Sequence, residues 1–180
     1  LQAGNVNTGA FDPLGPAIEL VRARRPDAWI HVDGAFGLWA AAAPGLRHLA
    51  QGVDGADSWA TDGHKWLNVP YDCGFAFVRD VDAHLAALSP QGAAYIVYGE
   101  AERDEFRWVP EYSRRARGFA SWAALRQLGR SGVAALVEGN CAIPVDIPPY
   151  CIAADHRARL VGLNEIGLRR RGVPAESVRA

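Results

Sequence analysis

The side chain best suited to covalent chemistry in this sequence is Lys65, which is the single lysine among 180 residues. The other basic side chains are arginines, whose guanidinium groups stay protonated and cannot condense with a carbonyl, whereas a lysine amine can. A general preference for arginine would explain why lysine is scarce. It does not explain why the remaining lysine lies between His64 and Trp66. This position suggests imine chemistry.

A second chemical feature is Asp33, which ends the short apolar run 28–32 and is followed by the small residues Gly34 and Ala35. We expect this run to be a strand buried on both faces, with a buried carboxylate at its carboxyl end. Such a carboxylate keeps a heterocyclic nitrogen protonated, and the small residues let a flat ring approach. Together with Lys65 this arrangement suits pyridoxal 5'-phosphate, which needs an amine, an acid and apolar contact with its ring.

Hydrophobic spacing and capping residues predict alternating helices and strands. Alternation of this kind indicates an α/β fold, in which ligands gather outside the carboxyl ends of the strands. We expect strands over 28–33, 57–60 and 73–78, a loop over 61–72 that holds Lys65, helices over 13–25 and 38–50, a helix capped by Asp80, and two amphipathic helices between about 119 and 139 that are separated near Gly129.

Several motifs together resemble the pyridoxal-phosphate-dependent group II amino-acid decarboxylases, which include the aromatic amino-acid, glutamate and diaminobutyrate decarboxylases. The resemblance covers about residues 1 to 142. It implies part of the large domain of a fold-type I enzyme, with a mainly parallel sheet flanked by helices. The matching segments are Gly4 with Thr8 to Pro13, His31 to Ala35, Ala56 to Ser58, His64 to Leu67, Val69 to Gly74, and Ser113 to Arg115 with Arg117.

The resemblance implies a role for four residues around the cofactor. Lys65 would form the internal aldimine, and Asp33 would pair with the pyridinium nitrogen. Ala35 would lie against the ring, and His64 would adjoin the phosphate and the imine, where it could orient groups or move protons. The implied reaction is decarboxylation of an L-amino acid to an amine and carbon dioxide.

Two further positions depart from the family pattern. Asn5 stands where many relatives have a threonine near cofactor and substrate. Asp62 stands where several relatives carry a phosphate-contacting asparagine, and an aspartate would repel a phosphate unless it is protonated or turned away. Thr61 or Ser58 could supply a hydroxyl instead.

We expect residues 1–142 to be a partial cofactor-binding domain and 143–180 to be a divergent tail, either frameshifted or poorly ordered. The resemblance also implies an N-terminal portion that carries most phosphate ligands and a histidine stacked on the ring, and this sequence contains neither. It further implies a tyrosine as proton donor. Tyr95 and Tyr98 lie nearby, but neither aligns cleanly, so no acid is assigned.

The composition disfavours several kinds of partner. A net charge of -1 and a pI near 6.6 provide no broad attraction for nucleic acid or acidic membranes. The three cysteines suggest neither a disulfide framework nor a zinc site. We expect a soluble cytoplasmic protein without metal, whose substrate is a small amino acid and whose full-length parent is a homodimer.

The long connection 89–117 is rich in aromatic residues and arginine, and we expect a lid or a subunit contact there. Its cluster of Arg114, Arg115 and Arg117 beside Tyr112 fits a solvated surface, a carboxylate-binding group or a dimer brace.

Three other functions remain compatible with the sequence. The same cofactor could serve another lyase or an aldehyde synthase, because the bond that breaks depends on substrate orientation. His31, Asp33 and His64 could instead hold a metal in a hydrolase. The chain could also be an inactive structural remnant.

Overall fold

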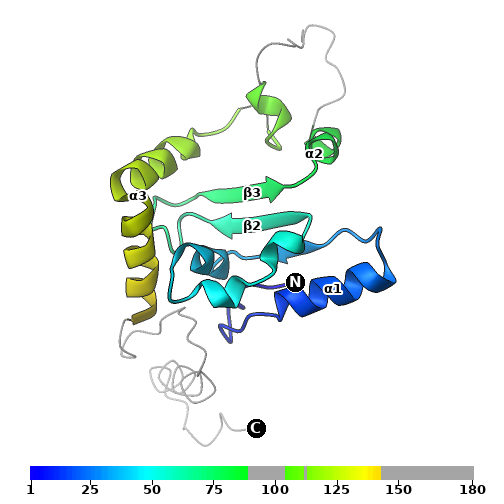
Figure 1. The fold of residues 1–180 in the computed structure, drawn as a ribbon. Coiled ribbons are helices and arrows are strands. Elements are labelled where there is room, and N and C mark those ends of the chain that lie inside the picture. The colour runs from blue at the N-terminus through cyan, green and yellow to red at the C-terminus, as the bar shows by residue number, and fades with distance from the viewer. Residues whose placement is uncertain (89–103, 112, 143–180) are drawn as a thin grey trace, which may run out of the picture.

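The computed structural model describes residues 1–88, 104–111 and 113–142, which form a small sheet with surrounding helices (Figure 1). Residues 89–103 and 112 of the predicted lid or subunit contact, Tyr95 and Tyr98, and the tail 143–180 lie outside the described residues, so the predictions made for them stay predictions. In chain order the elements are α1 (Leu14–Arg24), β1 (His31–Asp33), the 3-10 helices η1 (Gly37–Ala42), η2 (Arg47–Ala50) and η3 (Val53–Gly55), β2 (Ser58–Asp62), β3 (Gly74–Val78), α2 (Val81–Leu88), the 3-10 helix η4 (Glu105–Arg107) and α3 (Arg117–Ala142).

The sheet has the order β1-β2-β3 and is mixed. β1 and β2 are parallel, with Asp33 opposite Ala60, whereas β2 and β3 are antiparallel, with Asp62 opposite Gly74. The antiparallel pair follows from the connection between β2 and β3, which is too short for the helical crossover that a parallel pair needs. The predicted α/β fold is confirmed. The sequence did not indicate that the third strand is antiparallel.

A third parallel segment lies on the other side of β1. Gln2 forms a parallel bridge with Asp33, and the Ala3 amide donates to the Asp33 carbonyl at 2.8 Å. Residues 1–3, β1 and β2 therefore run in the same direction. The loops that follow them leave the sheet at one edge.

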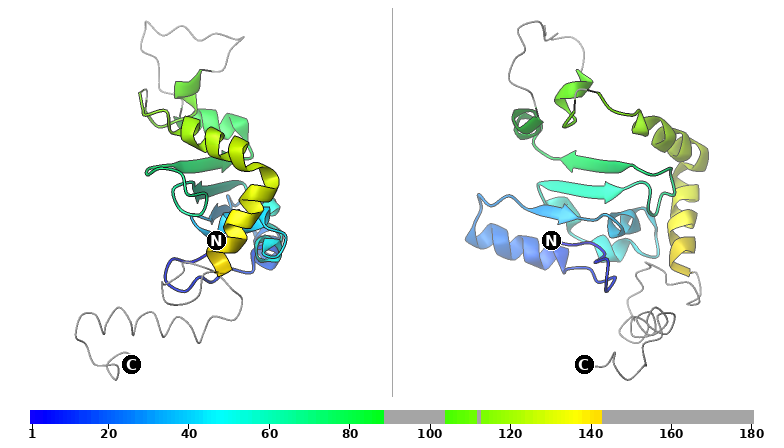
Figure 2. Two further views of the ribbon diagram at one scale, coloured as in Figure 1. Left: turned by 90° about the vertical axis from the view of Figure 1, so that its left-hand side faces the viewer. Right: turned by 180° about the vertical axis from the view of Figure 1, so that it is seen from behind.

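Two apolar clusters hold these elements together. One packs α1 against the sheet through Leu14, Ile18 and Val32. The other packs the loop after β2 against α3, which lies across the end of the sheet where β2 finishes and β3 begins (Figures 1 and 2). No helix among the described residues has the length and apolarity to cross a bilayer.

Three details of the predicted elements are corrected. β1 is buried only at Val32, while His31 and Asp33 are exposed, because β1 lies between one full strand and a short bridged segment. The predicted helix over 38–50 consists of two 3-10 helices, broken around Pro44 as its proline suggested. Asp62 belongs to β2 and not to the loop.

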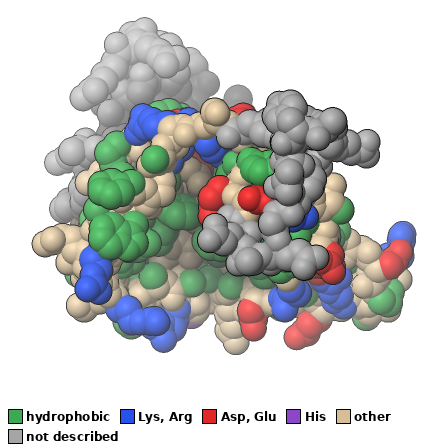
Figure 3. Space-filling model, turned by 90° about the horizontal axis from the view of Figure 1, so that it is seen from above, with side chains coloured by type: hydrophobic (Ala, Val, Ile, Leu, Met, Phe, Trp, Pro, Cys, Tyr) green, Lys and Arg blue, Asp and Glu red, His purple; other side chains and the backbone are tan. Residues whose placement is uncertain are grey.

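The helical pattern after residue 117 is confirmed, including its interruption. α3 changes direction at Gly129, whose φ of 62° suits glycine. The predicted apolar face of its first half is not buried: Phe119 and Trp122 are 73% and 62% exposed. Figure 3 shows hydrophobic side chains gathered on this side of the molecule. Only the second half of α3, with Val133 and Val137, reaches the core.

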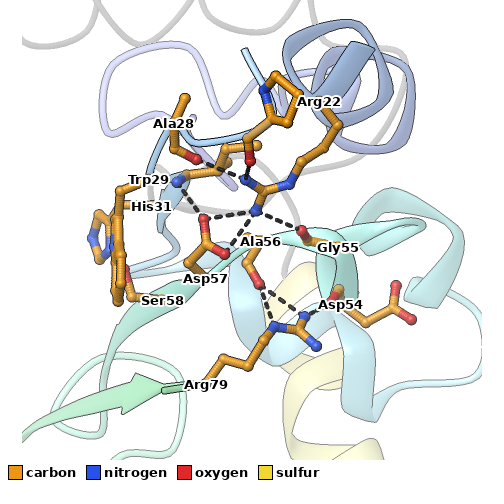
Figure 4. Close-up of polar contacts among 12 residues, drawn as sticks. Arg22, Ala28, Trp29, His31, Asp54, Gly55, Ala56, Asp57, Ser58 and Arg79 are labelled. Carbon is orange, nitrogen blue, oxygen red and sulfur yellow. Dashed lines mark hydrogen bonds and ion pairs between the residues drawn. The ribbon is translucent and has the colours of Figure 1, made fainter. Parts of the chain in front are cut away.

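A polar network fixes α1 to the segments that precede β1 and β2, at the amino-terminal ends of these strands (Figure 4). Arg22 donates to both carboxylate oxygens of Asp57 at 2.7 Å and to the Ala28 carbonyl at 2.6 Å. The same carboxylate accepts from the Ile30 amide at 2.6 Å. Arg79 donates to the carbonyl of Ala56 at 2.8 Å. The hydrogen bonds from Arg22 lower the pKa of Asp57 below its ordinary value.

We predict that Asp57→Asn lowers the free energy of unfolding by about 1 to 2 kcal/mol at neutral pH, because it breaks a charge-assisted bidentate pair that is partly buried. The lowered pKa means that this stabilisation is complete above the ordinary aspartate pKa and is lost as the pH falls through the folded-state pKa. Urea unfolding at neutral and acidic pH measures both effects. The control Asp27→Asn removes an exposed partner of Arg25 and should change little. Equal losses in the two variants would contradict the prediction.

Candidate functional site

Lys65 lies in the loop 63–73, immediately after the carboxyl end of β2. The loop turns back on itself: the Asn68 amide donates to the Lys65 carbonyl at 3.1 Å, and the Val69 amide donates to the Gly63 carbonyl at 3.2 Å. Asn68 adopts a positive φ of 57°, which asparagine tolerates better than most residues. This compact turn gives Lys65 a defined position next to the strand end.

The far side of the loop is tied to the start of α3. Arg117 donates to the two carboxylate oxygens of Asp72 at 2.9 and 3.1 Å. Arg117 thereby lowers the pKa of Asp72, and the carboxylate raises the pKa of Arg117. The buried Cys73 thiol lies 3.0 Å from the Ser121 hydroxyl. Within the predicted arginine cluster, Arg117 therefore braces this loop, and Arg114 pairs with Glu111.

The middle of the loop is tied to the second half of α3. Asn140 donates through Nδ2 to the Trp66 carbonyl at 3.0 Å. Trp66 and Leu67 are buried in the same cluster as Val137. Trp66 is thus a packing residue. These contacts bury Trp66 and Leu67 in the apolar cluster, so Lys65 is held at the edge of that cluster.

The Lys65 ammonium has two favourable contacts. Its Nζ lies 2.8 Å from Oδ2 of Asp62 and 3.9 Å from the centre of the Phe36 ring. Asp62 is itself fixed through its backbone, which donates to the Ala35 carbonyl at 3.2 Å and accepts from Nε1 of Trp39 at 3.0 Å. The ion pair therefore stands at a rigid strand end.

His64 points toward the same carboxylate. Its Nδ1 lies 2.8 Å from the Cys73 carbonyl oxygen and 2.9 Å from the Cys73 amide nitrogen, and its Nε2 lies 3.6 Å from Oδ2 of Asp62. Nδ1 accepts from the amide in one neutral tautomer and donates to the carbonyl in the other. The ring also contacts Tyr71, with ring centres 4.2 Å apart. The Cys73 backbone thus orients the ring so that Nε2 faces Asp62.

Asp33 and Ala35 lie at the neighbouring strand end. Oδ1 of Asp33 accepts from the Ala35 amide at 3.1 Å. Within the described part of the chain, Oδ2 has no hydrogen-bond partner. The carboxylate is exposed here, which corrects the expectation of a buried acid. Its strand-end position is as predicted, and Ala35 contacts the backbone of Asp62.

Asn5 uses its side chain within its own turn. Its Oδ1 accepts from the amides of Asn7 and Thr8 at 2.9 and 3.1 Å, and its Nδ2 donates to Gln2 at 2.7 Å. The turn follows the third parallel segment and so lies at the same edge as Asp33. A role of Asn5 toward a cofactor stays a prediction.

The hydroxyls considered as phosphate contacts are otherwise engaged. Thr61 donates to the Gly34 carbonyl at 2.8 Å in a buried position. Ser58 stands at the opposite end of β2, where it contacts Trp29 and the ring of His31. Among the described residues no three histidine, cysteine or acidic side chains form a group that could hold a metal.

The residues present fit a pyridine aldehyde such as pyridoxal. Lys65 provides the only side-chain amine, and the open Oδ2 of Asp33 can accept a hydrogen bond from a protonated ring nitrogen. Ala35 is a small residue whose carbonyl accepts from the Asp62 amide. When bound, such a cofactor supplies an electron sink for a carbanion. The chain supplies the amine of Lys65, the carboxylate of Asp33 and the imidazole of His64.

Fold and site together define part of the large domain of a fold-type I pyridoxal-dependent enzyme, and comparisons with known proteins give the family. The model of the pyridoxal-dependent decarboxylase conserved domain matches residues 1–167. The chain therefore belongs to this family.

Individual relatives agree. The chain is 32% identical over 160 residues to 4-hydroxyphenylacetaldehyde synthase of Rhodiola rosea, covering 88% of this chain and 32% of the relative. It is 31% identical over 170 residues to an aromatic-L-amino-acid decarboxylase of Drosophila melanogaster, covering 92% and 32%. The structure of TDC from Oryza sativa with PLP and tryptamine superposes with a TM-score of 0.70 at 29% identity, covering 78% of this chain and 29% of that one. The chain thus spans about a third of the length of these relatives.

Sequence reasoning missed the residues that hold the lysine in place. The three-residue spacing of Asp62 and Lys65 was visible, but a loop does not reveal which side chains meet. The contact of Phe36 with Lys65 and the bond from Asn140 to Trp66 join segments far apart in the sequence. Neither carries a local signal.

We predict that Leu67→Ala lowers the free energy of unfolding by about 3 kcal/mol, because Leu67 is 2% exposed and its removal leaves a cavity beneath the lysine loop. Leu20→Ala is the matched control, since Leu20 on α1 is 52% exposed and should cost little. Chemical denaturation of the two variants measures the difference. Similar small losses in both would show that the loop is not packed as described.

Proposed function

We propose that the whole protein containing this chain converts an L-amino acid to its amine and carbon dioxide, with pyridoxal 5'-phosphate bound to Lys65. The observation that carries this proposal is the placement of the only lysine at the carboxyl end of β2, beside the strand end that carries Asp33. Family membership supports the same cofactor. The names of the relatives favour an aromatic amino acid as substrate.

In this proposal each site residue has one task. Lys65 provides the amine that holds the cofactor, and the Asp33 carboxylate accepts a hydrogen bond from the ring N–H and so keeps that nitrogen protonated. Ala35 leaves room for the ring. His64 orients groups near the amine and can give or take a proton at Nε2. Asn5 would contact the cofactor only if its turn rearranges.

We further propose that the protein is a homodimer in the cytoplasm, with residues 1–142 in the cofactor domain and 143–180 as a separate tail. The exposed apolar side chains on the first half of α3 support a subunit contact. Cys73 and Cys141 are free thiols, which fits a reducing compartment.

Aldehyde synthesis on the same cofactor is the second candidate. The similarity to 4-hydroxyphenylacetaldehyde synthase favours it, because the two functions share the family and the lysine. The two candidates differ in product, which makes them separable by one assay.

The test uses the whole protein with pyridoxal 5'-phosphate and a panel of aromatic, acidic and basic L-amino acids. We expect carbon dioxide and an amine from at least one aromatic substrate, and borohydride should fix the cofactor to the peptide that contains Lys65. Lys65→Ala should abolish both the adduct and turnover. An aldehyde product would select the second candidate. Absence of an adduct on Lys65 would refute both.

We predict that Asp33→Asn lowers turnover by about 10²-fold or more while the borohydride adduct on Lys65 still forms, because an amide does not hold a ring nitrogen protonated as a carboxylate does. The control Asp54→Asn removes an exposed carboxylate and should retain normal turnover. Single-turnover kinetics and adduct mass separate the two effects. Normal turnover in Asp33→Asn would exclude the proposed pairing.

A further inference from the structure

Asp62 stands where several relatives of the resembled family carry an asparagine that contacts the cofactor phosphate. In this structure its carboxylate contacts Lys65. We infer that Asp62 is the counter-ion that positions Lys65, and that it does not bind phosphate. The inference rests on the proposed function, since it concerns the amine that would hold the cofactor. It assigns Asp62 as a positioning residue.

The geometry fixes this carboxylate on the lysine. Asp62 is the last residue of β2, and its backbone is bonded on both sides, to Ala35 and to Trp39. Its Oδ2 therefore projects from a rigid point and reaches Nζ of Lys65 at 2.8 Å. The turn after Gly63 brings the lysine back over the strand end. The pair results from the fold of the loop and not from the chance meeting of two flexible surface side chains.

The charges around the pair support the same assignment. The side chains of Asp62 and Lys65 are only 26% and 27% exposed, so water screens them less than a surface pair. Phe36 places its ring against the ammonium, which adds a second preference for a cation at that point. Nε2 of His64 lies 3.6 Å from the same carboxylate oxygen.

An ionised aspartate is unsuited to the alternative role. A carboxylate can only accept hydrogen bonds, while an amide in the same place could donate to a phosphate oxygen. A phosphate dianion beside Asp62 would meet a like charge, whereas the lysine ammonium meets an opposite one. The replacement of an amide by an acid thus changes what this position can bind.

The ion pair has a chemical consequence for Lys65. Attack on an aldehyde uses the lone pair of the unprotonated amine, and the carbonyl oxygen leaves as water when the imine forms. Asp62 binds the ammonium form and holds Nζ against Phe36. The ammonium must leave this pair and give one proton to water before the amine attacks, so Asp62 restrains the capture of any aldehyde, with or without a phosphate group.

The experiment compares pyridoxal with pyridoxal 5'-phosphate on the whole protein and on its Asp62→Asn variant. Borohydride adds hydride to the imine carbon and fixes the product as a secondary amine. Peptide mass spectrometry identifies the adduct on the peptide that contains Lys65 and separates it from adducts on other amines of the whole protein. We expect Asp62→Asn to raise the initial rate about threefold to tenfold with both aldehydes, as the loss of a partly exposed ion pair predicts.

Two further variants isolate the charge pair from general effects. Asp54→Asn removes the same charge from an exposed position and should keep the wild-type rate. Asp62→Glu restores a carboxylate within reach of the ammonium and should return the rate with pyridoxal to within about twofold of wild type. Circular dichroism confirms that each variant is folded.

The pyridoxal arm decides the inference. An unchanged rate with pyridoxal in Asp62→Asn would overturn it, even if the rate with pyridoxal 5'-phosphate rises, because that pattern indicates an effect on the phosphate alone. Failure of the proposed function looks different: neither aldehyde would label Lys65 in any variant.

Discussion

The packing of the loop 63–73 against α3 is the constraint on which the rest of the site depends. Leu67 and Val137 are buried in one apolar cluster, and Asn140 donates a hydrogen bond to the loop backbone at Trp66. Burial of these apolar side chains drives the contact, and the hydrogen bond fixes its register. A lysine on a free loop would sample many positions. Here its neighbours are part of the core, so the amine stays beside the end of β2.

Parallel strand direction brings the remaining site residues to the same edge. Residues 1–3, β1 and β2 run together, so Asn5, Asp33 and Asp62 follow three adjacent carboxyl ends. β3 returns antiparallel and closes the loop that carries Lys65. At the opposite end of the sheet the ion pair of Arg22 and Asp57 fixes α1. The candidate site residues and the contacts that anchor α1 therefore lie at opposite ends of the strands.

Much of the fold was predictable because the relevant signals are local. Helical spacing and terminal residues placed α1 and the interruption of α3 at Gly129, and short apolar runs placed the three strands. The exposure of Asp33 was not predictable, because it depends on which segments lie beside β1. The exposure of Phe119 and Trp122 was not predictable for the same reason. An amphipathic pattern predicts a helix with an apolar face, but it does not predict which segment covers that face.

The sequence by itself determined the chemical inventory: a single lysine, a strand-end aspartate 32 positions before it, and motifs that place the chain in the pyridoxal-dependent decarboxylase family. Those follow from residue type and spacing along the chain. Only the tertiary structure decided what the groups contact. Asp62 reaches Lys65 because of the way the loop turns after Gly63. Phe36 covers the ammonium and α3 supports the loop because distant segments pack together, and no short stretch of sequence encodes that packing.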